Sequence, residues 1–437
     1  MIESLHLKNV GPAPELTMRF APRLNLITGD NGLGKSFLLD VAWWALTRKW
    51  PHDLNFRLTS GYPARPIDVE RPATIGFRLT SKGTSVAYES KYVPRDEAWR
   101  GKAGRPSSPG LVIYAHADGG FSVWDPARNY WKKQGNVDIQ ERLPGYVFSA
   151  GEVWDGLESE AEGKRTLVCN GLLRDWAVWV RENGANAALM SALLGELAPE
   201  GESLAAGPLV RLSVNDARDI PSIQTRYAQA VPVLHASSGV RRVAGLAYML
   251  LWSWNEHLLA ARMLGEQPTS QVVMLCDEIE SHLHPRWQRS ILRSVLHVAK
   301  RLHSDATVQL VASTHSPLVM ASAEPLFDAE TDAWFDLDLE PKEGAEVRLT
   351  QRTFVRRGDV SAWLVSDAFD LKEARSLEAE TAIEEALALA RKGAPSKKDI
   401  ERVHKLLQAS LSDIDRFWVR WTEFKRSHEK QRKGAAA

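Results

Sequence analysis

The sequence predicts an α/β protein built around a mostly parallel sheet. Three short apolar runs, residues 24–28, 272–275 and 308–312, have the length of buried strands rather than of helices. Segments with helical periodicity lie between and beside them, such as residues 35–46 after the first run. Buried strands that alternate with helices are typical of a parallel sheet with helices on its faces.

The composition is that of an ordinary globular protein, with 44% hydrophobic and 25% charged residues. The 55 basic and 55 acidic side chains give a net charge of zero, so any nucleic acid contact would need a local patch. Two cysteines, Cys169 and Cys276, argue against a disulfide scaffold and favour a reducing compartment. The first residues lack a charged lead and an apolar stretch, so we expect no signal peptide there, and the longest apolar run, residues 243–254, is too short to cross a bilayer. We therefore expect a cytoplasmic protein without membrane contact.

The first half of the chain is predicted to be rich in antiparallel strands. Residues 2–7 alternate between apolar and polar and predict an edge strand, with residues 16–20 as its hairpin partner. Glycine-containing turns predict two further hairpins, and a Gly-, Pro- and Ser-rich stretch between them predicts a mobile loop. In order, these are the hairpin 75–79 with 85–92, the loop 100–110 and the hairpin 111–114 with 121–124. Residues 162–197, which follow, are predicted to be helical.

The second half alternates between strands and helices. The expected elements are strands 209–214 and 231–235, helix 238–264, strand 272–275, helix 286–302, strand 308–312, strands 334–337 and 347–349, and helices 372–392 and 397–433. We expect a head, residues 1–340, with parts 1–150, 151–265 and 266–340. A strand pair and helices, residues 341–437, then form a C-terminal extension.

The first chemical motif is a glycine-rich loop between a predicted strand and a predicted helix. It reads Gly29, Asp30, Asn31, Gly32, Leu33, Gly34, Lys35 and Ser36 and fits the P-loop pattern G-x-x-x-x-G-K-[ST]. Backbone N–H groups and the helix N-terminus favour phosphate oxygens. Lys35 is expected to reach the β- and γ-phosphates, and the Ser36 hydroxyl to bind Mg²⁺. The motif therefore predicts ATP and Mg²⁺ as ligands.

The second motif is a pair of acids, Asp277 and Glu278, at the end of the apolar run 272–275. In α/β folds, ligands bind at the carboxyl ends of the strands. We expect Asp277 to support Mg²⁺ and Glu278 to act as the general base toward the attacking water. A solvated acidic strand end is the alternative, which the upstream P-loop makes less favourable.

Two further motifs are weaker on their own. His315 follows the strand 308–312 and is predicted to sense the γ-phosphate, although a lone histidine there is more often a structural hydrogen-bonding group. Ser237, Ser238 and Gly239 open the long helix and form an anion cradle, although such residues are also ordinary helix caps. Their positions relative to the P-loop and the acids favour the functional interpretation of both.

The order of these motifs resembles that of an ABC-type ATPase head. Residues 277–285 and 313–317 resemble the SMC/RecF branch, and especially the ATPases of bacterial anti-phage systems, such as the OLD nuclease head and the Septu and PARIS ATPases. The resemblance covers residues 1–50 and 230–325. It implies a P-loop sheet, an antiparallel β lobe, a helical lobe that carries the signature motif, and a helical C-terminal extension.

The resemblance also implies that the ATP sites form between two heads. Ser237, Ser238 and Gly239 would then contact the γ-phosphate held by the other copy's P-loop, and residues 281–284 would form the D-loop at the seam. ATP would join two heads into a dimer or a higher oligomer, and hydrolysis would release them. A Q-loop residue is expected after the strand 145–149, where the chain offers Glu152 but no glutamine.

The favoured function is an ATPase switch in anti-phage defence that controls a separate effector chain. No TOPRIM-like acidic cluster or HNH-like Cys/His set follows His315, so we expect the nuclease on another chain. The C-terminal helices either form the docking site for this nuclease chain or only cap the ATPase fold. The basic tail, residues 425–433, is either a non-specific nucleic acid contact or a solvated end. A RecF-like DNA repair clamp is the alternative function, and a transporter's ATP subunit is a third.

Overall fold

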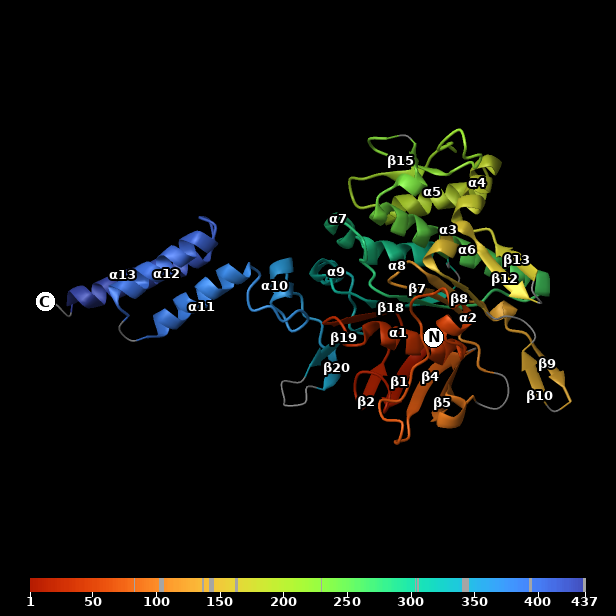
Figure 1. Cartoon of the computed structure of the whole chain (residues 1–437), viewed down its shortest axis with the longest axis horizontal. Coiled ribbons are helices and arrows are strands. Elements are labelled where there is room, and N and C mark those ends of the chain that lie inside the picture. Colours follow the sequence, from red (N-terminus) through yellow and green to blue (C-terminus); the bar gives the residue numbers. More distant parts are fainter. Residues whose placement is uncertain are drawn as a thin grey trace. The chain divides into compact units, whose positions relative to one another are not determined.

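The computed structural model describes two compact units, Met1–Gly358 and Asp359–Ala437 (Figure 1). The described residues are 1–81, 83–101, 106–135, 137–140, 145–161, 164–228, 230–302, 304, 306–339, 346–392 and 395–434. Residues 102–105 of the expected loop 100–110 lie outside them.

A sheet of eight described strands forms the centre of the first unit, in the order β11-β8-β7-β17-β18-β3-β19-β20. The middle five strands run parallel, as the sequence predicted, and β8, β11 and β20 run antiparallel to their neighbours. Their bounds are β3 Leu24–Gly29, β7 Leu111–Ala115, β8 Phe121–Trp124, β11 Gly145–Phe148, β17 Gln271–Cys276, β18 Thr307–Ser313, β19 Asp332–Leu339 and β20 Val347–Arg352.

The strand pair β19–β20 belongs to this central sheet rather than to a C-terminal extension beginning at residue 341. β19 pairs in parallel with β3 from Asp332 to Leu337, directly beside the strand that precedes the P-loop. Arg23 also forms an ion pair with Asp332, which is buried. Because these contacts join segments about three hundred residues apart, the first unit continues to Gly358.

An antiparallel sheet forms a second layer of the first unit, in the order β2-β1-β4-β5-β6. The strands are β1 Ile2–Lys8, β2 Glu15–Arg19, β4 Thr74–Ser81, β5 Thr84–Val93 and β6 Ala98–Trp99. The three predicted hairpins in this half of the chain are present, β1 with β2 and β4 with β5 here and β7 with β8 in the central sheet. The prediction that residues 2–7 form an edge strand was wrong, because β1 pairs with both β2 and β4.

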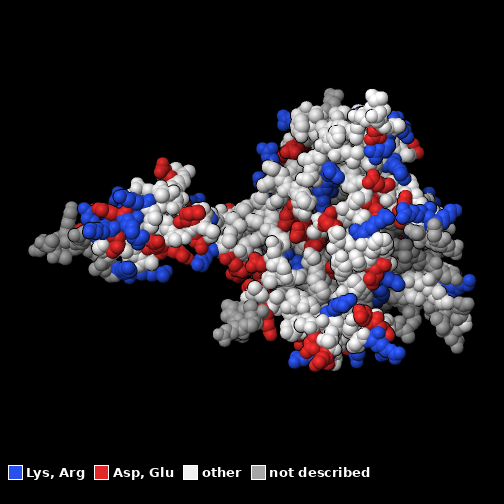
Figure 2. Space-filling view, viewed as in Figure 1, with Lys and Arg blue, Asp and Glu red and all other residues white. Residues whose placement is uncertain are grey.

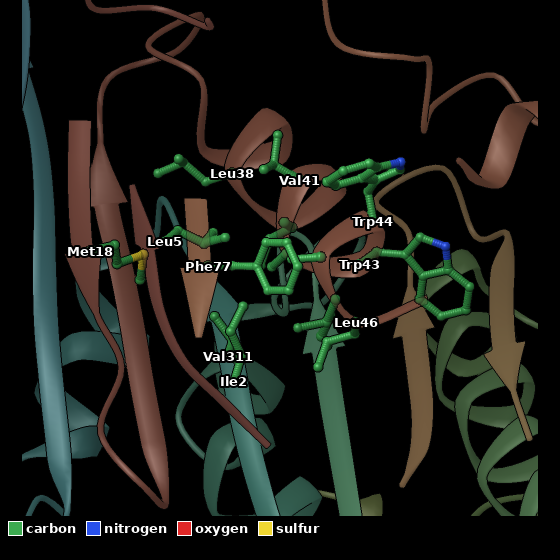
Figure 3. Packing of buried hydrophobic residues seen from close by; sticks show 14 of the residues in the cluster. Ile2, Leu5, Met18, Leu38, Val41, Trp43, Trp44, Leu46, Phe77 and Val311 are labelled. Atoms are coloured by element: carbon green, nitrogen blue, oxygen red, sulfur yellow. The ribbon is translucent and has the colours of Figure 1, made fainter. Parts of the chain in front are cut away.

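Helix α1, Lys35–Thr47, packs into a core that is shared by the two sheets. It is apolar on most sides, as expected of a helix covered by neighbours all round. Figure 3 shows Leu38, Val41 and Leu46 of this helix near Phe77 and Leu5 of the antiparallel sheet. This packing fixes the axis of the helix that begins at Lys35.

The helical lobe of the first unit contains more strand than predicted. Its elements are α3 Ala150–Asp155, β12 Leu157–Ala161, β13 Lys164–Cys169, α4 Leu172–Glu182, α5 Ala185–Leu197, β14 Leu204–Ala206, β15 Ser222–Thr225, β16 Val231–Pro232 and α6 Ser238–Leu264. The start of the region predicted as helical, 162–197, is β13, which pairs with β12, and residues 162–163 lie outside the described part. The predicted strand 209–214 contributes only a bridge from Val210 to Ile220. Helix α6 has the predicted bounds and ends at Gly265 in the left-handed conformation.

The predicted helices 286–302 and 397–433 are each split in two. The remaining helices are α2 Pro51–Leu54, α7 Pro285–Gln288, α8 Ile291–Leu302 and α9 Pro317–Ala323 in the first unit, and α10 Val360–Leu364, α11 Leu377–Arg391, α12 Lys397–Ser410 and α13 Phe417–Gly434 in the second. The short strands β9 Trp131–Gln134 and β10 Val137–Gln140 pair with each other. Helices α11, α12 and α13 share a hydrophobic core of their own.

The described residues on one face of the molecule are mixed in charge. Figure 2 shows Lys and Arg interspersed with Asp and Glu on the face in view, in keeping with the zero net charge. In the described part of the chain, no helix combines the length and the apolar character needed to cross a membrane.

Candidate functional site

Three neighbouring parallel strands deliver the predicted site residues to one edge of the central sheet. β3 leads into the P-loop, β17 into Asp277 and Glu278, and β18 into the segment that contains His315. The strands are in register, with Leu310 of β18 beside Leu24 of β3 and Leu275 of β17 beside Val311. Because parallel strands end at the same edge, the three segments meet there.

Glycine is required at two positions of the P-loop. Gly29 has φ +134° and Gly34 has φ +100°, values that other residues rarely adopt. A Cβ atom on Gly29 would lie 2.3 Å from the carbonyl oxygen of Leu337, and one on Gly34 would lie 2.8 Å from Cγ of Pro12. Larger residues would therefore push the loop off β19 and off the segment before β2. Within the same loop, Asp30, Asn31 and Gly32 are exposed and Leu33 is buried.

Lys35 lies folded over the P-loop. Its Nζ donates to the carbonyl oxygens of Gly29 at 2.6 Å and of Asp30 at 2.8 Å. Burial lowers the pKa of Lys35, and the nearby carboxylates of Asp277 and Glu278 oppose this shift. The ammonium is thus held over the mouth of the loop, where an incoming phosphate would exchange with the two carbonyls.

Ser36 and Asp277 offer oxygen atoms of the kind that Mg²⁺ prefers. Ser36 lies exposed in the first turn of α1, and Asp277 is buried at the end of β17. The Ser313 hydroxyl of β18 donates to Oδ1 of Asp277 at 2.6 Å and so fixes the carboxylate. This donor set fits a hard divalent cation beside the P-loop.

Glu278 takes a backbone conformation that is unusual for its residue type. Its φ is +46°, and its N–H donates to Oγ of Ser313 at 2.7 Å. Its side chain is 41% exposed, with Oε1 at 3.9 Å from Nε2 of His315. The turn therefore directs this carboxylate out of the sheet, toward His315 and away from the buried Asp277.

The backbone of His315 is held by Glu280, a residue that sequence reasoning did not select. The buried Glu280 carboxylate accepts from the His315 N–H at 2.5 Å and from Oγ1 of Thr314 at 2.7 Å. Burial raises the pKa of Glu280. Burial, followed by the charge of Lys35, lowers the pKa of His315, which favours the neutral imidazole. Glu280 thus ties the β17 segment to the β18 segment across the site.

Replacing Glu280 with Ala is expected to destabilise the fold by about 2 kcal/mol, because the buried Thr314 hydroxyl and the half-buried His315 N–H lose their acceptor. Chemical denaturation would measure this change in the free energy of unfolding. Glu278→Ala is the matched control in the same turn, since no hydrogen bond to its side chain is present in the described structure. Equal midpoints for the two variants would contradict the structural role of Glu280.

The three residues of the expected signature motif are placed at the start of α6. Ser237 caps the helix, with its Oγ accepting from the Val240 N–H at 3.5 Å, and both serines are exposed. A Cβ atom on Gly239 would lie 3.1 Å from the carbonyl oxygen of His282, so this helix start packs on the loop 281–284. The single chain therefore brings Lys35, Asp277, Glu278 and His315 together, and it leaves the signature residues at a separate exposed helix start.

Glu152, which the chain offers at the expected Q-loop position after the strand 145–149, does not reach this edge beside Asp277. Glu152 caps α3: its carboxylate accepts from the Ser149 N–H at 2.9 Å and from Asn55 Nδ2 at 2.5 Å, and it forms an ion pair with Arg57 at 2.9 Å. These contacts occupy the carboxylate in the structure of the lobe. β11 is separated from β17 by β8 and β7.

On the side of β17 away from β18 lies β7, and it is followed directly by His116, which sequence reasoning missed. His116 is fully buried between Oγ of Ser60 at 3.0 Å and Oγ of Ser122 at 2.8 Å. Burial lowers the pKa of His116 to about 3, so the ring is neutral. Its ring lies 3.9 Å from that of Tyr114, whose hydroxyl donates to Oδ1 of Asp40 on α1 at 2.9 Å. A chain of contacts thus joins the buried His116 to the half-buried Asp40 on the P-loop helix α1.

Comparisons with known proteins match both parts of the chain that contribute to this site. A family described as "AAA domain" matches residues 4–93, which include the P-loop. A family described as "AAA domain, putative AbiEii toxin, Type IV TA system" matches residues 205–321, which include the signature residues, both acids and His315.

Two curated proteins are similar in sequence. An OLD nuclease of Thermus scotoductus is 25% identical over 337 residues, which are 73% of this chain and 59% of that protein. A Vibrio cholerae protein named "Retron Vc95 probable ATPase" is 42% identical over 50 residues, which are 11% of this chain and 9% of that protein. The chain thus spans about three fifths of the nuclease and about a tenth of the retron protein.

Among solved structures, an SMC head bound to the C-terminal winged-helix domain of ScpA matches with a TM-score of 0.42 and 13% identity. The match covers 80% of this chain and 98% of that one.

Proposed function

Since the chain has the motif order and site geometry of an ABC-type P-loop ATPase of the SMC/RecF/OLD-like kind, we propose that it is an ATP-driven switch in anti-phage defence. The observation that carries the ATPase part is the meeting of Lys35, Asp277, Glu278 and His315 at one sheet edge, with the signature residues on a separate, exposed helix start. A site of this kind is completed by a second copy of the chain, which would bring its own α6 to the P-loop.

Each predicted residue has a role in this proposal. The P-loop amides and Lys35 hold the phosphates, Ser36 and Asp277 hold Mg²⁺, and Glu278 takes the proton of the attacking water. His315 contacts the γ-phosphate through its neutral ring. The cation, when bound, neutralises charge on the phosphates. Ser237, Ser238 and Gly239 of one copy contact the γ-phosphate held by the other.

The defence role draws support from the two sequence relatives, a nuclease and a retron protein. We propose that a separate chain supplies the nuclease activity and that the second unit, Asp359–Ala437, is its dock. That unit has its own hydrophobic core and exposes large apolar side chains, including Ile414 and Val419. The cytoplasm is the proposed location, because both cysteines are buried and unpaired.

Nucleotide-dependent dimerisation tests the ATPase part. With Mg²⁺ and a non-hydrolysable ATP analogue, the protein is expected to shift from monomer to dimer in analytical ultracentrifugation. Lys35→Ala is expected to weaken nucleotide binding about thirtyfold, or about 2 kcal/mol, because a charged donor to phosphate is lost. Lys49→Ala is the matched control, since Lys49 is exposed beyond the end of α1. A sedimentation profile that is the same with and without nucleotide would contradict an ATP site that is shared by two copies of the chain.

Purification of the protein with its natural neighbours tests the defence part. A stoichiometric nuclease, identified by mass spectrometry on the sized complex, is the expected result. A protein that instead purifies alone, dimerises with ATP and binds DNA would support the RecF-like repair clamp in its place.

A further inference from the structure

The last two residues of β3, Thr28 and Gly29, are paired on one side in the described structure. On the side of β18, the pairing of β3 ends at Ile27. On the side of β19, it continues for two more residues, with Asp336 beside Thr28 and Leu337 beside Gly29. From Thr28 onward, β19 is therefore the strand that holds the start of the P-loop in place.

A polar network of side chains lies at this point of the pairing. The Thr28 hydroxyl donates to Oδ1 of Asp336 at 2.8 Å and accepts from Nε1 of Trp334 at 2.8 Å. Oδ2 of Asp336 accepts from Nε and Nη2 of Arg352 on β20, at 3.3 Å and 3.2 Å. Thr28, Trp334 and Asp336 are all buried. Two side chains of β19 thus fix the hydroxyl before the P-loop, and β20 holds the carboxylate that accepts from it.

The ion pair between Asp336 and Arg352 needs an explanation beyond stability. Burial raises the pKa of Asp336, and the Thr28 hydrogen bond and the Arg352 charge oppose that rise. A buried ion pair is seldom more stabilising than apolar side chains of the same volume, because each charge loses its water. The hydrogen bonds of the carboxylate do have defined directions, however, and they place the Thr28 hydroxyl. The pair is therefore better explained by the position that it gives to Thr28.

The position of Thr28 matters because the next residue contacts Lys35. The carbonyl oxygen of Gly29 accepts from Nζ of Lys35 at 2.6 Å. A P-loop binds phosphate through backbone N–H groups that converge on its oxygen atoms. A displaced loop start would therefore misplace both the amides and the ammonium that the nucleotide phosphates need.

We propose that Asp336, held by Arg352, is a positioning residue that fixes the start of the P-loop through Thr28 and so sets the affinity for the nucleotide phosphates. The inference rests on the proposed ATPase function and adds the strand pair β19–β20 to its site. In this arrangement, neither Asp336 nor Arg352 contacts the nucleotide. Because the P-loop holds the phosphates before and during hydrolysis alike, a defect here affects binding rather than turnover.

Asp336→Asn tests this role through nucleotide affinity. We expect the dissociation constant of a non-hydrolysable ATP analogue with Mg²⁺, measured by calorimetry, to rise about tenfold. At saturating ATP, kcat should stay within about twofold. Asp338→Asn is the matched control, since it makes the same change two residues along β19, at a half-buried side chain that accepts from the Leu339 N–H.

The outcomes separate a role in binding from a role in folding alone. If Asp336→Asn lowers the free energy of unfolding but binds the analogue as tightly as the unsubstituted protein, the proposal is overturned. A fall in kcat with unchanged affinity would overturn it as well. An unsubstituted protein that binds no ATP would instead count against the proposed function itself.

Variants of Thr28 then decide whether the effect passes through its hydroxyl. Thr28→Ser keeps the hydroxyl and is expected to keep the affinity within about twofold, whereas Thr28→Val keeps the shape and is expected to lose about tenfold. In the double variant, Thr28→Val with Asp336→Asn, the two losses should not add, because one interaction underlies both. Fully additive losses would contradict the route through Thr28.

Arg352→Gln makes the same test from β20, should Asp336→Asn fail to fold. The side chain of Arg352 is 30% exposed, so its replacement disturbs the core less than a change at Asp336. We expect an affinity loss of about threefold, because the carboxylate remains but is held less firmly. Arg348→Gln, at an exposed position of the same strand, is the matched control. Equal affinities for these two arginine variants would overturn the part assigned to the ion pair.

Discussion

Glu278→Gln is expected to lower ATP hydrolysis by about 100- to 10,000-fold while leaving ATP binding and dimer formation intact. The amide keeps the size of the side chain but takes no proton from water. The substitution should leave the fold unchanged, since the backbone N–H of Glu278, not its carboxylate, makes the hydrogen bond to Ser313. The variant should therefore accumulate as an ATP-bound dimer.

Single-turnover hydrolysis and sedimentation on the same samples measure both effects. Glu266→Gln is a suitable control, because Glu266 is exposed just beyond α6 and undergoes the same chemical change. Turnover by Glu278→Gln at the unsubstituted rate would show that another group activates the water. Normal binding without a trapped dimer would instead separate hydrolysis from head release.

The parts of the molecule that could be predicted from the sequence are those fixed by local patterns. The glycine spacing of the P-loop, the apolar runs before Asp277 and His315, and the capped helix α6 each depend on neighbours within a turn or a strand. Parallel pairing of the apolar runs follows from their alternation with helices, and it places their ends together. The core of the candidate site could therefore be assembled from three short segments.

The parts that could not be predicted depend on pairing between distant segments. Whether β1 is an edge or an inner strand depends on its pairing with β4, about seventy residues later. The pattern of residues 2–7 alone does not indicate this pairing. Glu280 becomes a buried acceptor only because Thr314 and His315 lie on the adjacent strand end. His116 could not be singled out for the same reason, since β7 gains its place beside β17 from a non-local pairing.

Asp40 is expected to make the stability of the protein fall as the pH rises toward 7. Burial raises the pKa of Asp40 from 3.8 to about 7, an effect that Asp277 reinforces and the Tyr114 hydrogen bond opposes. Because the folded state holds the proton more tightly than the unfolded state, folding is favoured at low pH. This advantage is complete below the unfolded pKa of about 4 and is lost as the pH rises through about 7, above which the half-buried Asp40 of α1 is ionised in the folded state as well.

Asp40→Asn removes this titration and keeps an acceptor for the Tyr114 hydroxyl. The variant should gain about 2 to 3 kcal/mol over the unsubstituted protein between pH 5 and pH 8, as measured by denaturant unfolding at each pH. Tyr114→Phe removes the bond that opposes the shift, so its fall in stability should extend to higher pH than that of the unsubstituted protein. Parallel stability curves for Asp40→Asn and the unsubstituted protein would mean that Asp40 titrates normally. In that case, burial would not keep the Asp40 side chain protonated at its position between α1 and β7.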